Sequence, residues 1–205
     1  MTDWYRYENA ARTEGFLAVC GIDEAGRGPL AGPVFAAAVI LPENCRIEGI
    51  NDSKKLTPKK RDILFDEIRS DALSYGIGFA TEQEIDRVNI LQATFLAMKR
   101  AFDALKVHPD LALVDGNRMP DLGAETRTII KGDALSASVA AASILAKVSR
   151  DRLLCEIDRI YPQYGFAKHK GYGTAYHVEM LKKYGPCPVH RTSFLKKILG
   201  EPKNG

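Results

Sequence analysis

The sequence lacks any apolar run approaching the about 20 residues that a membrane-spanning helix requires, which argues against a transmembrane protein. Residues 1–14 are polar and charged and have no apolar core, so we expect no signal peptide, a cytoplasmic location and no membrane partner. The chain also has no internal repeat and no low-complexity segment. These absences favour one globular domain, with or without a small appendage, in a chain of 205 residues.

Cysteines are few, and none forms a Cys-x-x-Cys pair. Four scattered thiols predict free cysteines in a reducing compartment and exclude a disulfide-stapled scaffold. The pair Cys187 and His190 has the spacing of half a zinc site, but the sequence offers no second half. We therefore interpret this pair as structural.

The net charge of +3 conceals an asymmetry along the chain. Residues 147–205 contain 12 basic and 5 acidic side chains, a balance of +7, whereas residues 1–146 have a balance of −4. An acidic site beside a basic C-terminal portion would suit a metal-using enzyme that acts on a polyanion. Basic side chains that merely coat surface helices would give the same balance, so charge alone leaves both interpretations open.

Strand-like and helix-like segments alternate, which predicts an α/β domain. The predicted strands are residues 16–24 and 34–41, which can pair as a hairpin, then 76–80, 111–114 (expected to be parallel) and 127–131. The predicted helices are residues 57–75, 90–105, 135–160, 175–184 and 191–199. Thr81 and Glu84 resemble a capping box, and residues 166–174 are interpreted as a glycine- and lysine-rich loop.

Acidic residues follow several of the predicted strands. Asp23 and Glu24 end the first one, while Asp115 and Asp133 come directly after two later ones. Ligands of α/β sheets collect outside the carboxyl ends of the strands, so four carboxylates at one rim predict a site for divalent cations. Neighbouring side chains of a strand point to opposite faces, so both Asp23 and Glu24 can serve one site only if the strand ends or bulges there.

The loop after this acidic pair holds an arginine between two glycines, Gly26 and Gly28. Its backbone amides and single cation would suit a phosphate and the sugar attached to it. A dinucleotide-binding loop, and with it a nicotinamide-dependent oxidoreductase, is the competing interpretation, but Pro29 and Pro33 interrupt the helix that such a loop requires. Asp23 as a turn residue beside a solvated Glu24 is the simplest alternative.

These residues resemble the type 2 ribonucleases H (ribonuclease HII). Residues 21–30 (GIDEAGRGPL) look like the signature of that family. Further agreement comes from residues 52–56 (DSKKL), 115–117 (DGN), 131–133 (KGD), 141–147 (AASILAK) and 169–172 (HKGY). The resemblance implies a ribonuclease H-like core with a central mixed sheet flanked by helices over residues 1–160, and a small helical C-terminal portion over residues 161–205 that completes the substrate groove.

The resemblance also implies an activity. It is that of an endoribonuclease that hydrolyses the RNA strand of RNA–DNA hybrids and incises 5′ to single ribonucleotides in duplex DNA. Two Mg²⁺ or Mn²⁺ ions would act on the phosphodiester and leave 5′-phosphate and 3′-hydroxyl ends. The family implies a monomer whose partner is nucleic acid. Its catalytic and metal-binding residues would be Asp23, Glu24, Asp115 and Asp133.

Substrate contacts follow from the same motifs. Gly26, Arg27 and Gly28 are candidates for recognising the ribose 2′-hydroxyl, and Tyr172 for packing on the sugar or base pair. The expected phosphate contacts are Lys54, Lys55, Ser143, Lys147, His169 and Lys170. A half-buried core tyrosine and a solvated basic face are the structural alternatives. A binding protein without catalysis is the competing function, but pure binding would not require four carboxylates.

Overall fold

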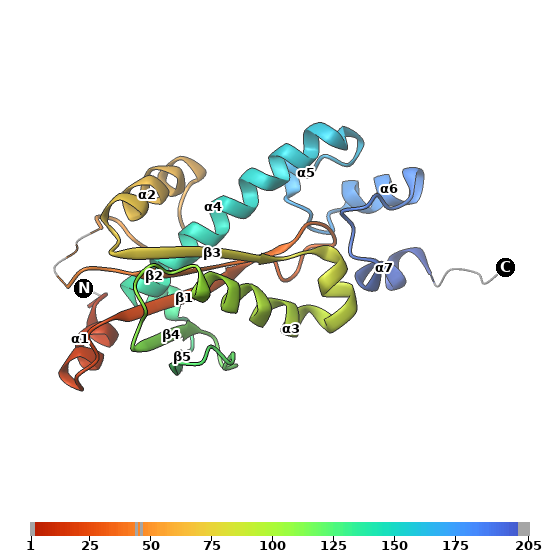
Figure 1. The fold of residues 1–205 in the computed structure, drawn as a ribbon. Coiled ribbons are helices and arrows are strands. Elements are labelled where there is room, and N and C mark those ends of the chain that lie inside the picture. Colours follow the sequence, from red (N-terminus) through yellow and green to blue (C-terminus); the bar gives the residue numbers. More distant parts are fainter. Residues whose placement is uncertain (1–2, 44, 46, 201–205) are drawn as a thin grey trace.

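The computed structural model describes residues 3–43, 45 and 47–200, and it places one mixed sheet between helices (Figure 1). The strands lie in the order β3-β2-β1-β4-β5. Strand β1 pairs antiparallel with β2 and parallel with β4, so the predicted hairpin and the predicted parallel strand are both confirmed. The strand bounds are β1 Val19–Ala25, β2 Val34–Ile40, β3 Ser74–Ala80, β4 Leu111–Asp115 and β5 Glu125–Ile129.

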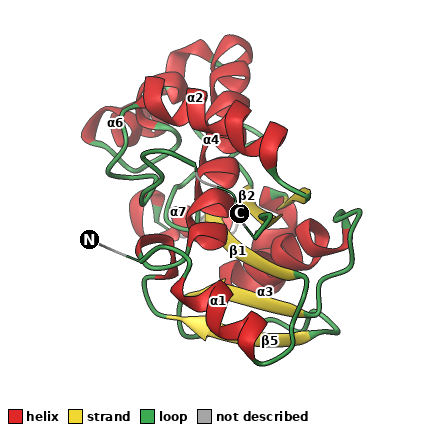
Figure 2. Cartoon of the chain, turned by 90° about the vertical axis from the view of Figure 1, so that its left-hand side faces the viewer, coloured by secondary structure: helices red, strands yellow, loops and turns green. Residues whose placement is uncertain are grey.

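Helices cover both faces of this sheet, and three of them gather beyond one end of it (Figures 1 and 2). Within the described ranges, no helix is long and apolar enough to cross a membrane. The α-helices are α1 Arg6–Thr13, α2 Pro58–Asp71, α3 Glu82–Asp103, α4 Ala137–Ile160, α5 Phe166–His169, α6 Ala175–Tyr184 and α7 Thr192–Leu199. The short 3₁₀ helices are η1 Gly132–Ala134 and η2 Pro162–Tyr164.

The core forms two layers because strand side chains alternate between faces. In the fully buried strand β2, Ala37 and Val39 pack with α2 and α4, whereas Ala36 and Ala38 pack with α3. Strand β1 lies directly against α4, since a Cβ atom on Gly21 would lie 2.1 Å from the carbonyl carbon of Ser138. This contact fixes β1, the strand that carries Asp23 and Glu24, against α4.

Several predicted element bounds were wrong. The helix predicted over residues 57–75 ends at Asp71, because Ala72 is extended and β3 already begins at Ser74. The strand predicted over 127–131 is displaced to Glu125–Ile129, and the first strand begins at Val19. The loop predicted over 166–174 opens with the single turn of α5.

Helix α3 begins eight residues before the predicted helix over 90–105. The capping box of Thr81 and Glu84 is confirmed, and it opens a first segment of this helix. Asn89, with φ of 70°, then breaks the helical path, and its side chain accepts hydrogen bonds from the amides of Leu91 and Gln92. The predicted helix is thus the second segment only.

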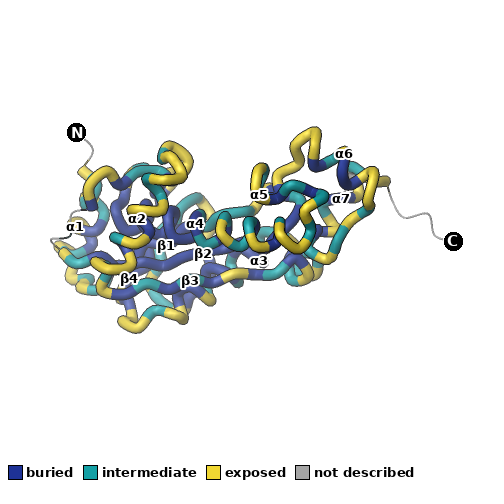
Figure 3. The backbone as a smooth tube through the Cα atoms, turned by 90° about the horizontal axis from the view of Figure 1, so that it is seen from above, coloured by how far each residue is buried: buried dark blue, intermediate teal, exposed yellow. Residues whose placement is uncertain are grey.

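The C-terminal helices form a small cluster of their own around the end of α4 (Figure 3). Leu154 and Ile157 of α4 pack there with Tyr164, Phe166 and Leu181. The cluster also reaches Ala31, in the loop after β1. Because of this contact, the C-terminal helices touch the loop that follows the acidic pair.

Candidate active site

Asp23 and Glu24 lie two residues and one residue before the end of β1, so of the two conditions expected above the strand meets the first: it ends there and does not bulge. Its register with β2 continues without interruption through Asp23, Glu24 and Ala25. Its pairing with β4, however, stops at Ile22. The amide of Glu24 donates instead to Oδ1 of Asp23 at 2.7 Å. Pairing with β4 has therefore stopped at both carboxylates, although β4 itself runs one residue further, to Asp115.

Asp115 is the last residue of β4, as predicted, but Asp133 does not follow a strand directly. Asp133 lies in η1, because β5 ends earlier and Lys131 turns the chain with φ of 60°. Oδ1 of Asp115 accepts a hydrogen bond from the amide of Gly132 at 2.6 Å. This bond ties the end of β4 to the turn that carries Asp133.

The carboxylates act on one another electrostatically. Burial, and then the charges of Glu24 and Asp115, raise the pKa of Asp23 well above its usual range, and Asp23 is only 4% exposed. Burial also raises the pKa of Glu24, against the opposing charge of Arg27. The pKa of Asp133 is raised by burial and by Asp115. Acids gathered in this way lower their free energy when a cation binds among them.

The donor set fits a hard divalent cation, because it consists of oxygen ligands without a neighbouring histidine or cysteine. Within residues 3–43, 45 and 47–200, however, no three His, Cys, Asp or Glu side chains form a ready-made metal cluster. Two side-chain cations lie among the acids: Arg27 is 3.2 Å from Glu24, and Nζ of Lys54 is 3.9 Å from Asp133. An ion that binds here therefore has to draw the carboxylates together.

A hollow of about 240 Å³ opens beside Glu24, and we call it the Tyr172 hollow. It brings together most of the predicted substrate contacts. Its walls are Glu24, Ala25, Gly26, Arg27, Gly28, Ser53, Lys54, Ser143, Lys147 and Tyr172. Tyr172 is 47% exposed, so a half-buried structural tyrosine stays open as the alternative to a substrate contact.

A second hollow, of about 300 Å³, lies on the other side of Glu24 and contains Asp115. Phe95, Met98 and Arg118 line it, and sequence reasoning did not single out any of these three. Glu24 and Arg27 thus line both hollows.

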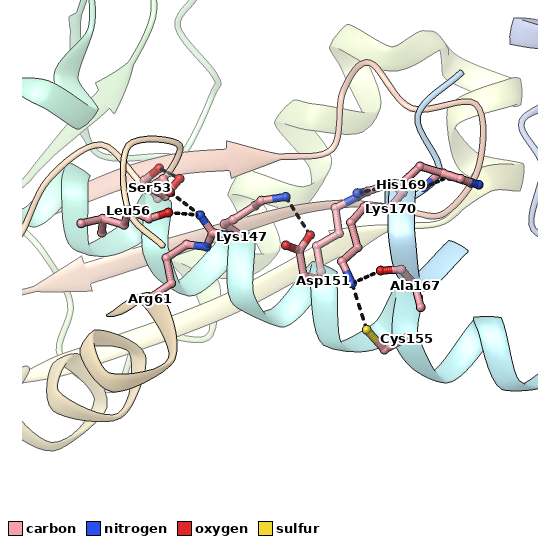
Figure 4. A network of polar contacts seen from close by, with 12 residues as sticks. Ser53, Leu56, Arg61, Lys147, Asp151, Cys155, Ala167, His169 and Lys170 are labelled. Atoms are coloured by element: carbon pink, nitrogen blue, oxygen red, sulfur yellow. Dashed lines mark hydrogen bonds and ion pairs between the residues drawn. The ribbon is translucent and has the colours of Figure 1, made fainter. Parts of the chain in front are cut away.

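A longer groove of about 680 Å³ follows α4 away from the Tyr172 hollow, and we call it the α4 groove. Lys147 lines both spaces, and its ammonium donates to Asp151 at 2.8 Å (Figure 4). Lys170 lies further along, where it donates to the Ala167 carbonyl and to Sγ of Cys155 (Figure 4). Further basic side chains in this groove are Arg61, Arg152, Arg159 and Lys168.

The remaining predicted phosphate contacts have different surroundings. Lys54 and Lys55 are exposed in the turn before α2. Ser143 is buried, and its hydroxyl is 2.9 Å from that of Ser53. His169 uses both ring nitrogens within the chain, since Nε2 meets the Tyr164 carbonyl and Nδ1 accepts from the amide of Gly171.

Sequence reasoning missed two buried arginines behind the Gly26–Gly28 loop. Arg150 donates to the carbonyls of Ala31, Pro33 and Lys170. Its side chain occupies the space where a Cβ on Gly26 would lie, 2.0 Å from Nε, which explains a glycine there at φ of 97°. Arg191 is the second. The burial of Arg150 had a signal, because it shares a helix face with Ala146 and Leu154.

Comparison with known proteins gives a consistent result. The family model for Ribonuclease HII matches residues 20–197. A Ribonuclease HII of Caldicellulosiruptor bescii is 57% identical over 197 residues, which are 96% of each chain. The crystal structure of the ribonuclease H2 from Pyrococcus horikoshii aligns with a TM-score of 0.73 at 30% identity, covering 89% of this chain and 97% of that one.

A more distant structure shares the fold. Bst-RNase HIII in complex with Mn²⁺ has a TM-score of 0.66 at 19% identity and covers 93% of this chain and 67% of its own. The resemblance that rested on residues 21–30 is thus confirmed, as is the ribonuclease H-like fold. The chain belongs to the ribonuclease HII family, whose members are metal-dependent hydrolases that cleave the RNA of RNA–DNA hybrids.

Proposed function

We propose that this chain also incises 5′ to single ribonucleotides embedded in duplex DNA, and that it leaves 5′-phosphate and 3′-hydroxyl ends. One observation carries the proposal. In the acidic pair of β1, burial raises the pKa of both carboxyls and the charge of Glu24 raises that of Asp23 further, and Glu24 borders directly on a hollow walled by the Gly26–Gly28 loop and Tyr172. Glu24, one of the proposed metal ligands, therefore also lines the space that would receive the sugar.

The catalytic roles fall to the four carboxylates. Asp23, Glu24, Asp115 and Asp133 would hold two Mg²⁺ or Mn²⁺ ions, which supply Lewis acidity and an activated water. The Mn²⁺ complex of the structural neighbour supports a divalent ion of this kind. Asp115 would keep its orientation through the Gly132 amide, and Asp23 through the Glu24 amide.

Recognition of the sugar falls to the Tyr172 hollow. Gly26 and Gly28 let backbone atoms approach a 2′-hydroxyl, and Arg27 adds a cation beside Glu24. The exposed ring of Tyr172 faces the same space and would pack on the sugar or the base pair at the junction. Replacing Arg27 by alanine should weaken the discrimination between ribose and deoxyribose.

The rest of the substrate would lie along basic side chains. Lys54, Lys55, Ser143 and Lys147 would contact phosphates near the site, with His169 and Lys170 further along the α4 groove. In this proposal residues 1–160 are the catalytic core, and residues 161–205 complete the groove. The protein would act as a monomer on nucleic acid, and its four free cysteines suit a reducing, cytoplasmic location.

The decisive experiment maps a nick. A DNA duplex with one ribonucleotide is incubated with the protein and Mg²⁺ or Mn²⁺, beside the all-DNA duplex as control. We expect one cut, 5′ to the ribonucleotide, with a 3′-hydroxyl and a 5′-phosphate. Cleavage of long hybrids without any cut of this duplex would refute the proposed specificity. Binding without cleavage of either substrate would favour the non-catalytic alternative.

A further inference from the structure

Arg191 is fully buried, yet every hydrogen bond that the structure gives its guanidinium ends on a backbone carbonyl. Two of these carbonyls belong to Gly26 and Arg27, at 2.6 and 2.9 Å. The third belongs to Gly32, further along the same loop. Burying a guanidinium without a carboxylate partner is costly, and burial lowers the pKa of Arg191 to about 9. The hydrogen bonds of Arg191 therefore hold residues 26–32 in one conformation.

His190, the preceding residue, connects to Tyr172 through a second histidine. The amide of Cys187 donates to Nδ1 of His190, so the proton of this neutral ring is assigned to Nε2. Nε2 then donates to Nε2 of His177 at 3.0 Å, and Nδ1 of His177 donates to the Tyr172 carbonyl at 2.9 Å. The bonding of the chain thus fixes both tautomers and holds the backbone of Tyr172.

Main-chain bonds join the two connections. The amide of Arg191 donates to the Leu30 carbonyl, and the amide of Gly32 donates to the Val189 carbonyl, both at 2.9 Å. The amide of Leu30 in turn donates to the Gly171 carbonyl at 2.8 Å. Residues 187–191 therefore lie between the Gly26–Gly28 loop and the Tyr172 loop and bond to both. The Cys187–His190 pair, which sequence reasoning left as structural, belongs to this segment.

We propose that His190 and Arg191 are positioning residues that set the distance between the Gly26–Gly28 loop and Tyr172, and thereby the discrimination of ribose from deoxyribose. The proposal rests on the function proposed above for these two walls of the hollow. The segment touches neither the carboxylates nor the α4 groove among its hydrogen bonds, so its effect is on selectivity. A residue that only stabilised the fold would weaken binding of both duplexes equally.

The test compares two dissociation constants, one for a duplex with a single ribonucleotide and one for the all-DNA duplex, with Ca²⁺ in place of the catalytic ion. Wild type should bind the ribonucleotide duplex more tightly. Arg191→Lys keeps the charge but cannot reach three carbonyls, so this preference should fall about tenfold. Arg100→Lys, on the exposed side of α3, is the matched control and should keep the wild-type preference.

If Arg191→Lys fails to fold, a second pair of variants can still test the proposal. His190→Gln retains an amide donor near the position of Nε2, whereas His190→Leu has none. The glutamine variant should discriminate better than the leucine variant. The proposal is overturned if folded variants lose affinity for both duplexes in equal proportion, or keep the full preference. If wild type shows no preference, the proposed recognition function fails, and this inference fails with it.

Discussion

The rim of carboxylates and the segment 187–191 both bury groups that prefer water, but they do so in opposite ways. At the rim, Asp23 and Glu24 face another acid, and Arg27 and Lys54 offset them only in part. In the segment, each guanidinium nitrogen of Arg191 donates to a backbone carbonyl, and both ring nitrogens of His190 have partners.

This difference separates two tasks. A satisfied polar network favours one arrangement, since any shift leaves a buried donor or acceptor unpaired. A cluster of like charges instead leaves binding free energy for a ligand of opposite charge. We infer that the four carboxylates of the rim are arranged to bind a cation, whereas residues 187–191 hold two loops in place. The variants below test this difference.

Asp115→Asn should have the largest effect. It keeps the shape and an acceptor for the Gly132 amide but removes one charge from the rim. We expect kcat on RNA–DNA hybrids to fall at least ~1,000-fold, with little change in duplex affinity. Steady-state kinetics with Mg²⁺ measures this, and Asp103→Asn, at an exposed ion pair of α3, is the control. Near-normal turnover by the Asp115 variant would remove this residue from the catalytic set.

His190 should make stability depend on pH. Its pKa is lowered to about 4, mainly by burial and then by His177, whereas an unfolded histidine has a pKa of 6.5. Between these values the unfolded state binds the extra proton, so the free energy of unfolding falls on acidification, by about 2–3 kcal/mol at pH 4.5. His190→Gln cannot titrate, and its urea-unfolding free energy in EDTA should fall less between pH 7 and 4.5.

Rim acids contribute in the opposite direction, because their pKa values are raised in the folded state. Those contributions are common to both proteins and cancel in the comparison of wild type with His190→Gln. Equal losses on acidification in the two proteins would contradict the account of a buried neutral imidazole.

Much of the rim could be predicted from sequence, because its chemistry is local. The acids stand at or near strand ends, Asp115 and Asp133 are next to glycines, and the motif of residues 21–30 is contiguous. Asp133 shows the limit, since the length of β5 and the left-handed turn at Lys131 decide where it lies. Neither is encoded in the periodicity of a five-residue strand.

The holding segment could not be predicted in the same way. Arg191 binds carbonyls that precede it by about 160 residues, and no local pattern announces such a pairing. Every residue has a backbone carbonyl, so a hydrogen bond from a side chain to a carbonyl does not require a particular residue type at the acceptor position. The kink at Asn89 was not predicted for a related reason. The capping box before it and the helical pattern after it were each visible in the sequence, but nothing showed that they belong to one helix.

Asp23→Asn should stabilise the protein while it disables it. The asparagine oxygen can still accept from the Glu24 amide, and the buried charge that repels Glu24 and Asp115 disappears. We expect the free energy of unfolding at pH 7 in EDTA to rise by about 1–3 kcal/mol, and hydrolysis to be lost. Denaturant unfolding measures the gain. A less stable variant would show that the rim carries no repulsion for a ligand to relieve.

Lys54→Met should have the smallest effect, because its ammonium is exposed and 3.9 Å from its nearest acid, Asp133. As a phosphate contact it would contribute to the salt dependence of duplex binding. The slope of log K against log [salt] should become shallower by about 0.9, with stability almost unchanged. Lys99→Met, on α3, should leave the slope as it is. An unchanged slope for Lys54→Met would make this lysine a counter-charge of the acids and would remove it from the proposed phosphate contacts.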